Sequence, residues 1–434
     1  MIDFAVKEAE KAGMEDAIAK LEDRRETQIK FHNSDISVIK EWTSRQLSLF
    51  LAAGKKRFML TLENPDRDMV TQAIANAANI MPLLAPTDTY HGIGRQRPMR
   101  EGTVPYDDAI TDTACLVELA EAAIDEAMQT ADGAAGVLSA GTEHVQLAST
   151  AGIHVTDDNS RAMLSIRAFT DTGSGHAVRC ARTLDGLHSE AGSDAARDAS
   201  LARKPRQGDR GTYDIIFSSM AFANLIQHVA MQASAFFVDT GLSFLAGEQG
   251  KMVGDPVLTL QDSGIHPAGI ASRSFDDEGI ATGETTIIEH GRLLSYLHNT
   301  STAHRYDTKT TANAGLVAPH PWNIVVTPGD ASIEEMISEI DHGLYISNVW
   351  YTRFQNYRTG SFSTIPRDAS ILIENGEFCD GVTGIRLSDR LPRLLHGIEL
   401  LARQQEQIYW WEVETPVFTP AALIRDVPVT QSFV

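Results

Sequence analysis

The sequence predicts an α+β fold with two domains. Short segments with alternating apolar and polar residues, typical of half-buried strands, recur along the whole chain, and a few longer segments repeat apolar residues at helical spacing. A polar stretch rich in structure-breaking residues, 203–208, separates two parts of different character. We expect an N-terminal mixed α/β domain with strand meanders over residues 1–204. A C-terminal β-rich domain over residues 205–434 is expected to hold a large curved mixed sheet braced by helices.

The N-terminal part contains two groups of expected strands, each accompanied by helices. An amphipathic helix opens the chain and extends to about Glu22. The first strands are expected at residues 27–32, 36–42, 46–53 and 57–63, followed by a helix that Asp68 caps and Pro82 ends. Helices over residues 112–130 and near 193–202 flank further strands at 144–147, 152–156, 162–169 and 176–182. The sequence at 160–163 is similar to that at 44–47, a short match that suggests a duplicated meander.

Glycine turns dominate the C-terminal part. Asn375-Gly376 joins residues 370–374 to 377–379, and Asn-Gly is the preferred pair for a tight hairpin turn. His290-Gly291 is expected to form a similar hairpin turn between residues 285–289 and 292–297. Two helices, over residues 218–245 and near 390–407, are expected to brace the resulting sheet.

Composition and charge argue against several classes of protein. The chain has 37 Lys and Arg against 58 Asp and Glu, and this net charge of −21 opposes direct binding to nucleic acid. No apolar run approaches the ~20 residues of a membrane span, and the N-terminal residues lack the pattern of a signal peptide. Cys115, Cys180 and Cys379 form no CxxC motif and are expected to be reduced, mostly buried thiols. We expect a cytoplasmic protein with no membrane partner and no direct nucleic-acid partner.

Common catalytic motifs are absent from the sequence. It contains no phosphate-binding P-loop and no GxSxG nucleophile motif. No two of its 14 histidines are three, four or five residues apart, and the closest pair, His298 and His304, does not share a helix face. These two histidines, together with Asp276 or Asp277, remain one alternative site for a hydrolase.

Three segments resemble a known family. They are ASRSFDDEG at residues 271–279 with the hairpin sequence that follows it, SNVWYTRFQNYRTGSFS at 347–363, and VIKEW at 38–42. The chain resembles the TldD/PmbA family, once called modulators of DNA gyrase, over nearly its whole length and in the same order. The resemblance implies a cytosolic zinc metalloprotease in which a TldD-type subunit pairs with a TldE (PmbA)-type subunit. Such a complex processes or degrades unfolded peptides.

The same resemblance indicates which subunit type this chain is. TldD-type subunits carry HExxxH on a helix, and a cysteine near the C-terminus completes the zinc site. The histidine positions correspond here to Ile226 and Met231, and the glutamate position to Gln227. Ile and Met offer no usual zinc ligand, Gln is no general base, and no cysteine follows Cys379. The resemblance therefore implies a TldE/PmbA-type chain with no catalytic or metal-binding residues and no cofactor of its own. Zinc is expected in a TldD-like partner.

Five residues are candidates for contacts with an extended peptide: Arg273, Asp276, Asp277, Trp350 and Arg353. The carboxylates at positions 276–278 either bind a cation or a peptide, or cap a turn at Gly279. Trp350 and Arg353 either line a peptide channel beside an exposed strand edge, or belong to the core and its solvated border.

Two reactive side chains have ordinary structural interpretations. His228 is expected on the polar side of the 218–245 helix with Asn224 and Gln232, as a surface or hydrogen-bonded residue. Cys379 directly follows a hairpin strand and is expected to be a packed thiol rather than a nucleophile.

Three hypotheses about function follow, each from a different class. The first is a zinc-free TldE/PmbA-like subunit that supports substrate binding and the zinc site of a TldD-like partner in a heterodimer. The second is a stand-alone homodimer of the gyrase-modulator type that binds peptides or a protein without catalysis. The third is a self-sufficient hydrolase built around His298 and His304.

Overall fold

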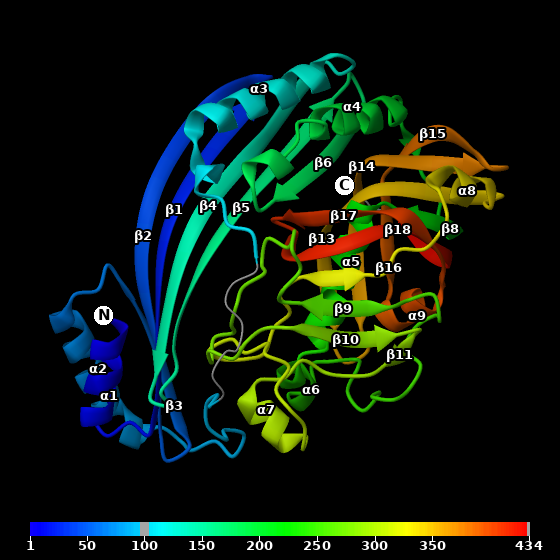
Figure 1. Ribbon diagram of the computed structural model, residues 1–434. Coiled ribbons are helices and arrows are strands. Elements are labelled where there is room, and N and C mark those ends of the chain that lie inside the picture. Colours follow the sequence, from blue (N-terminus) through cyan, green and yellow to red (C-terminus); the bar gives the residue numbers. More distant parts are fainter. Residues whose placement is uncertain (96–103, 432–434) are drawn as a thin grey trace.

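The computed structural model describes residues 1–95 and 104–431, which form two sheets with helices packed against them (Figure 1). The six-stranded sheet comes from the first half of the chain and the twelve-stranded sheet from the second. This architecture is the α+β fold that the sequence predicts, and the large mixed sheet of the second half is confirmed.

The first sheet has the strand order β3-β2-β1-β4-β5-β6, and every neighbouring pair is antiparallel. Its strands are β1 (Asp16–His32), β2 (Asp35–Ala53), β3 (Lys56–Glu63), β4 (Gly133–Ser149), β5 (His154–Phe169) and β6 (Ser174–Ala181). The long strands curve strongly, so that one face of the sheet is concave toward the second half of the chain (Figure 1).

Four helices cover the other face of this sheet: α1 (Ile2–Lys11), α2 (Arg67–Ile80), α3 (Thr113–Met128) and α4 (Ala191–Leu201). Side chains alternate between the faces of a strand. Ala17, Ala19 and Leu21 of β1 therefore pack with the apolar residues of α1 and α2. Ile18, on the opposite face, packs with Phe275 of the second half.

The opening helix is shorter than the sequence suggests. It ends at Lys11 rather than near Glu22, because Gly13 has φ of +84° and breaks the helical backbone. The next residues pair with β2 and β4, and this pairing outweighs their helical apolar spacing. Residues 43–45, expected as a turn, also belong to β2 because they pair with residues 23–25 of β1.

The first half consists of two similar units, α1-β1-β2-β3-α2 and α3-β4-β5-β6-α4. β4 begins and ends 117 residues after β1 (133 − 16 and 149 − 32). The two strands pair antiparallel at the centre of the sheet, so an approximate twofold axis relates the units. This arrangement supports a duplicated meander. The sequence match at Ser44 and Ser160 is one residue out of the structural register.

Asp112 caps the N-terminus of α3, where its Oδ1 accepts hydrogen bonds from the N–H groups of Ala114 (2.9 Å) and Cys115 (3.3 Å). We expect Asp112→Ala to lower the free energy of unfolding by about 1 kcal/mol, because two helix N–H groups lose their acceptor. Urea denaturation measures this loss. Asp112→Asn keeps an acceptor and serves as the control; an equal loss in both variants would argue against capping.

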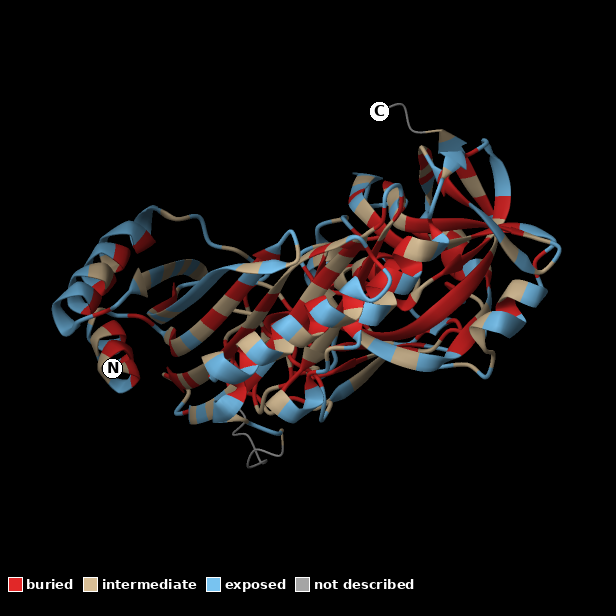
Figure 2. Cartoon of the chain, turned by 90° about the horizontal axis from the view of Figure 1, so that it is seen from above, coloured by how far each residue is buried: buried red, intermediate tan, exposed pale blue. Residues whose placement is uncertain are grey.

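The second sheet is mixed. Its strands are β7 (Arg206–Gln207), β8 (Gly211–Phe217), β9 (Leu260–Ser263), β10 (Glu284–Glu289), β11 (Arg292–Leu293), β12 (Ile324–Val326), β13 (His342–Asn356), β14 (Ser361–Glu374), β15 (Glu377–Thr383), β16 (Ile385–Arg390), β17 (Ile398–Trp410) and β18 (Val413–Gln431). The pairs β12–β18, β8–β13 and β7–β15 are parallel and the others antiparallel. The main apolar core lies between this sheet and its helices, and Figure 2 shows the buried residues concentrated there.

Both helices expected in the second half are shorter than the sequence suggests. The 218–245 segment forms α5 (Ser219–Gln232) and α6 (Ala235–Asp239), with a break between them. The 390–407 segment forms only α9 (Leu391–His396), and Ile398 then begins β17, because pairing with β18 buries the same apolar residues. The remaining short helices are α7 (Thr300–Arg305) and α8 (Ile333–Ser338).

The two predicted hairpin turns are present. Asn375 and Gly376 have φ of 50° and 79° and join β14 to β15. His290 and Gly291 have φ of 45° and 76° and join β10 to β11. The second arm of that hairpin is shorter than expected, since β11 ends at Leu293.

The connection between the halves is short: α4 ends at Leu201, and β7 at Arg206 already pairs with β15 of the second sheet.

All three cysteines are free, and the expectation that they are mostly buried is wrong. Cys115 and Cys379 are exposed, and Cys180 is half-buried.

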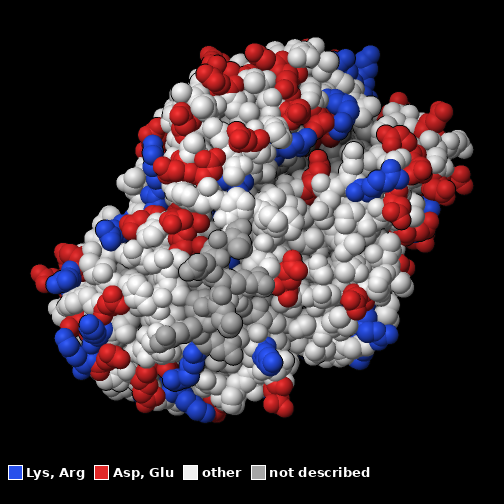
Figure 3. All heavy atoms as spheres, in the orientation of Figure 1, with Lys and Arg blue, Asp and Glu red and all other residues white. Residues whose placement is uncertain are grey.

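No helix within residues 1–95 and 104–431 has the length and apolar character needed to cross a membrane. Basic and acidic side chains are interspersed on the face seen in Figure 3, which shows no continuous basic surface.

Candidate functional site

Helix α5 lies in the centre of the second half. Its N-cap, Ser218, accepts a hydrogen bond from the N–H of Ala221 (3.2 Å) and donates one to the carbonyl of Ser347 (2.6 Å). Twelve of the 14 helical residues are buried, so the helix is enclosed rather than amphipathic at a surface. Most of the polar residues of this helix therefore also lie in the protein interior.

Two of the three positions that the resemblance singled out, Ile226 and Gln227, have structural roles in the interior. Ile226 is 1% exposed and belongs to the main apolar core. Gln227 is 2% exposed; its Nε2 donates to the carbonyl of Glu412 (2.6 Å), and its Oε1 accepts from the N–H of Glu414 (3.0 Å). Met231 is half-buried. These side chains do not fit a zinc site, because none is a usual zinc ligand and the polar one is occupied by the β17–β18 turn.

Two further amides on α5 bind surrounding groups. Asn224 donates to the carbonyl of Glu412 (3.1 Å) and accepts from the hydroxyl of Thr352 (2.5 Å). Gln232 accepts from the N–H of Phe244 (3.1 Å). Asn224, Gln227 and Gln232 thus hold neighbouring chain segments in place through hydrogen bonds.

His228 packs against the edge of Phe354, with ring centres 4.9 Å apart. It is half-buried rather than fully on the surface. Burial, reinforced by the charge of Arg353, lowers the pKa of His228 to about 4, so the imidazole is neutral at pH 7. Over the residues that the structure describes, no group of three or more His, Cys, Asp and Glu side chains is arranged to hold a metal ion.

The alternative hydrolase site does not assemble in this structure. His298 is buried, its Nδ1 lies 3.2 Å from the hydroxyl of Thr302, and burial lowers its pKa to about 4. His304 instead stacks on His91, with ring centres 4.1 Å apart. In the described part of the chain, no hydrogen bond or ion pair joins either histidine to Asp276 or Asp277.

Asp276 stabilises a tight turn. It is fully buried, and its carboxylate accepts hydrogen bonds from the N–H groups of Glu278 (3.0 Å), Ile280 (2.9 Å) and Ala314 (3.0 Å). Burial and then the charge of Glu278 raise the pKa of Asp276 above its ordinary value. In this structure the carboxylate of Asp276 is inaccessible to a peptide. Its hydrogen bonds are those of a residue that caps the turn at Gly279, which is one of the two alternatives that the sequence left open.

Arg273 and Asp277 belong to a closed ring of alternating charges that joins the two halves. Its successive pairs are Lys20–Glu22 (3.2 Å), Glu22–Arg24 (3.1 Å), Arg24–Glu143 (2.6 Å), Glu143–Arg273 (3.6 Å), Arg273–Asp277 (3.8 Å) and Asp277–Lys20 (2.9 Å). Burial alone would raise the pKa of Asp277, but the charges of Lys20 and Arg273 outweigh it and hold this pKa below its ordinary value. The ring connects the concave face of the first sheet to the 273–277 segment.

Trp350 and Arg353 both lie on β13 and differ in their surroundings. Trp350 is half-buried against Trp410 and Trp411, with ring centres 5.7 and 5.2 Å apart. Arg353 is exposed and lies over the ring of Tyr351, 5.6 Å from its centre. Trp350 is thus part of an aromatic cluster, while Arg353 remains accessible to solvent.

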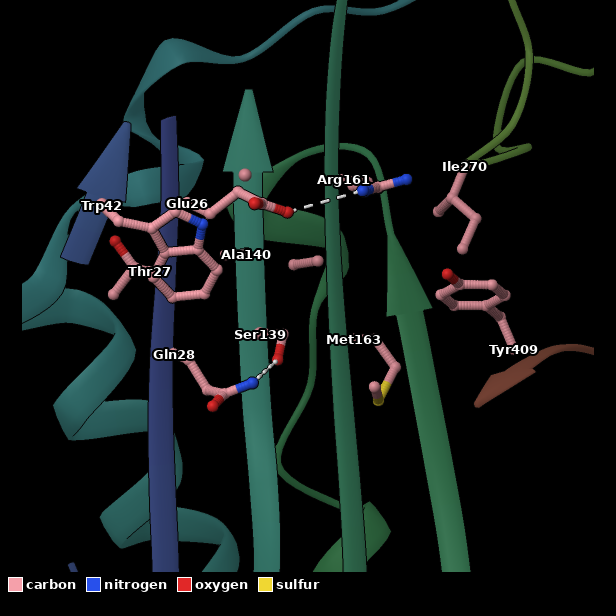
Figure 4. Close-up of a pocket in the computed structure, with 12 residues that line it drawn as sticks. Glu26, Thr27, Gln28, Trp42, Ser139, Ala140, Arg161, Met163, Ile270 and Tyr409 are labelled. Atoms are coloured by element: carbon pink, nitrogen blue, oxygen red, sulfur yellow. Dashed lines mark hydrogen bonds and ion pairs between the residues drawn. The ribbon is translucent and has the colours of Figure 1, made fainter. Parts of the chain in front are cut away.

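A cavity of about 200 Å³ lies on the concave face of the first sheet, where the second half meets it (Figure 4). Its lining includes Glu26, Gln28, Trp42, Ser139, Gly141, Arg161 and Met163 from the first sheet, and Ile270 and Tyr409 from the second half. None of the five candidate peptide-binding residues lines it. Arg273 lines a smaller neighbouring cavity of about 70 Å³ that shares Glu26, Arg161 and Ile270 with the first.

The cavity residues were missed by sequence reasoning, although the sequence contains a signal for them. Lys20, Glu22, Arg24, Glu26 and Gln28 alternate along β1 and therefore share one face of the strand. Extending the opening helix to Glu22 concealed this alternation. With β1 assigned correctly, the pattern indicates a strand whose polar face meets other protein groups.

Comparisons with known proteins agree with the fold. Residues 210–431 match the family model of the PmbA/TldA metallopeptidase C-terminal domain, and residues 101–235 match that of the central domain. Metalloprotease PmbA of Escherichia coli O157:H7 is 27% identical over 207 residues, 48% of this chain and 44% of that protein. Metalloprotease MJ0996 of Methanocaldococcus jannaschii is 28% identical over 223 residues, 49% and 48% of the two chains. The alignments span about half the length of these curated relatives.

Solved structures match over the whole length. TldE from Thermococcus kodakarensis has a TM-score of 0.84 at 20% identity, with 99% of each chain covered. A Thermotoga maritima protein described as a modulator of a DNA gyrase has a TM-score of 0.84 at 23% identity, again with 99% of each chain covered. At these identities the matches establish the fold.

Proposed function

Because the chain belongs to the PmbA/TldD family of metallopeptidases, we propose that it is a zinc-free, TldE/PmbA-like subunit of a cytoplasmic metalloprotease complex. In this proposal its partner is a TldD-like HExxxH subunit, which holds the zinc and supplies the metal chemistry. The complex processes or degrades unfolded peptides. This chain contributes substrate binding and support for the partner's zinc site, and no catalytic residue.

The observation that carries this proposal is the role of two buried side chains on helix α5. Ile226 occupies the apolar core, and Gln227 binds the backbone of Glu412 in the β17–β18 turn and of Glu414 at the start of β18. A chain that kept the family fold but used these positions for packing is suited to a supporting role. His228 packs against Phe354, and the described residues contain no group of three or more His, Cys, Asp and Glu side chains arranged to hold a metal, so this histidine does not replace the missing set.

The test compares the chain alone with the chain plus an HExxxH relative. We expect the purified chain to contain far less than one zinc per molecule and not to cleave an unfolded peptide. Adding the partner should produce cleavage that exceeds that of the partner alone. An alanine substitution in the partner's HExxxH motif should abolish cleavage, whereas His228→Ala in this chain should leave it intact.

Two outcomes would replace the proposal. Stoichiometric zinc with cleavage by the isolated chain would favour a self-sufficient hydrolase. A stable homodimer that binds peptides, and neither associates with nor stimulates the HExxxH relative, would favour the stand-alone binding protein.

A further inference from the structure

The polar face of β1 continues beyond the charged ring into the open cavity. Lys20, Glu22 and Arg24 are engaged in the ring, and Glu26 and Gln28 are the next residues on the same face. Glu26 lies 3.6 Å from Arg161, and Gln28 lies 3.4 Å from Ser139. These separations are too long for strong hydrogen bonds, so polar atoms of both pairs remain free to bind a ligand.

The strand register places these groups together. Trp42, Glu26, Gly141 and Arg161 form one row across β2, β1, β4 and β5, and Gln28, Ser139 and Met163 lie in the adjacent row. A Cβ atom at Gly141 would lie 3.1 Å from Cγ of Glu26. The absence of that atom leaves room for Glu26 to extend across β4 toward Arg161.

Aromatic and apolar side chains flank the polar pairs. In Figure 4, Trp42 lies on one side of the cavity and Ile270 and Tyr409 lie on the other, with Met163 between them. Trp and Tyr offer large flat surfaces that bind aromatic groups without losing much conformational freedom. The cavity therefore combines an ion pair, an amide and an apolar slot, which suits a small amphipathic ligand.

We propose that this cavity binds an α-carboxylate that is attached to an N–H donor and an apolar, preferably aromatic, side chain. Arg161 receives the carboxylate, because a planar guanidinium matches its two oxygens. Glu26 and Gln28 accept the N–H, and the side chain packs on the aromatic and apolar residues that flank these polar pairs. This chemistry is present in the C-terminal residue of a peptide and in a free amino acid. Binding needs neither zinc nor a partner subunit, so the inference goes beyond the proposed function.

The charge of the cavity and of the chain also affects which ligands bind. Glu26 and Arg161 together carry no net charge, whereas the chain as a whole carries −21. A ligand with an additional carboxylate would meet this negative field without a second cation in the apolar slot. Phenylalanine derivatives should therefore bind better than the corresponding aspartate derivatives.

The experiment uses isothermal titration calorimetry of the full chain with N-acetylphenylalanine, N-acetylphenylalaninamide and free phenylalanine. We expect the N-acetylated acid to bind at least about tenfold more tightly than the amide, since a hydrogen bond to a charged group is lost in the amide. Arg161→Gln should remove this difference. Arg390→Gln, a change in an exposed arginine of the second half, should preserve it.

A second variant tests the place of binding. Ser139→Leu puts an apolar side chain into the cavity and should abolish binding of all three compounds without unfolding the protein, as checked by its melting temperature. Tighter binding of N-acetylphenylalanine than of phenylalanine would identify a peptide C-terminus as the source of the carboxylate, and the reverse order would identify a free amino acid. No saturable binding, equal affinity for acid and amide, or full affinity in both cavity variants would overturn the proposal.

Discussion

Replacement of Asp277 with asparagine is expected to lower the free energy of unfolding by about 3–5 kcal/mol, as breaking a buried ion pair does in other proteins. Asp277 contacts Lys20 at 2.9 Å and Arg273 at 3.8 Å, and the side chains of Lys20 and Asp277 are only 10% and 12% exposed. The substitution leaves a buried ammonium group without its main counter-charge. Denaturation in guanidinium chloride, followed by tryptophan fluorescence and circular dichroism, measures the loss.

Matched variants separate this effect from general damage. Asp158→Asn removes an exposed carboxylate of β5 in the first sheet, which pairs with His144, and should cost less than about 1 kcal/mol. The double variant Lys20→Met/Asp277→Leu removes both charges and should recover much of the loss, because apolar residues can replace a buried pair. An Asp277→Asn variant as stable as Asp158→Asn would show that the ring does not hold the two halves together.

The pH dependence gives a second readout of Asp277. Its folded pKa lies below its ordinary value, so its stabilising contribution is present above the unfolded pKa of about 4. The contribution is lost as the pH falls through the lower, folded pKa. The stability difference between the native protein and Asp277→Asn should therefore be full at pH 6 and shrink below about pH 4. A difference that stays constant down to pH 2.5 would contradict the assigned cause.

The fold class could be predicted from sequence because local patterns determine it. Alternating side chains specify strands, Asn375-Gly376 specifies a hairpin, and Asp112 specifies a helix start. Where a segment fits both the helical and the strand spacing of apolar residues, the local pattern was insufficient to assign its secondary structure. Residues 16–22 and 398–407 have apolar spacing compatible with a helix, and only pairing with distant strands makes them β1 and β17.

The candidate site depended on contacts between distant segments and was less predictable. Arg273 and Asp277 were expected as possible contacts for a peptide, but their partners come from β4 and β1, more than 100 residues away in sequence. The hydrogen bonds of Gln227 to the β17–β18 turn are equally invisible in the sequence of the helix alone. Proposing which positions correspond to the family's zinc motif was possible because a family pattern is compared residue by residue. Deriving what the substitutes do required the structure.

Introduction of the metal motif into α5 is expected to destabilise the protein without creating a zinc site. The variant combines Ile226→His, Gln227→Glu and Met231→His. We expect a loss of at least about 4 kcal/mol, because a polar ring enters the core at position 226 and a large apolar side chain is lost. The carboxylate at position 227 cannot donate to the carbonyl of Glu412, so two oxygens face each other there. Metal analysis after gel filtration and the melting temperature with and without zinc provide the measurements.

Single substitutions locate the cost. Met231→His changes a half-buried residue and should cost about 1 kcal/mol or less, whereas Ile226→His and Gln227→Glu should account for most of the loss. If the triple variant instead binds one zinc per chain and gains thermal stability from it, the helix has preserved the geometry of a metal site. The proposed lack of zinc would then depend on these three side chains alone. If the variant fails to bind zinc, the packing around the helix does not accommodate a metal site, because Ile226 serves the core and Gln227 binds the β17–β18 turn. That second outcome is the expected one, and the cost at position 227 is its most direct measure.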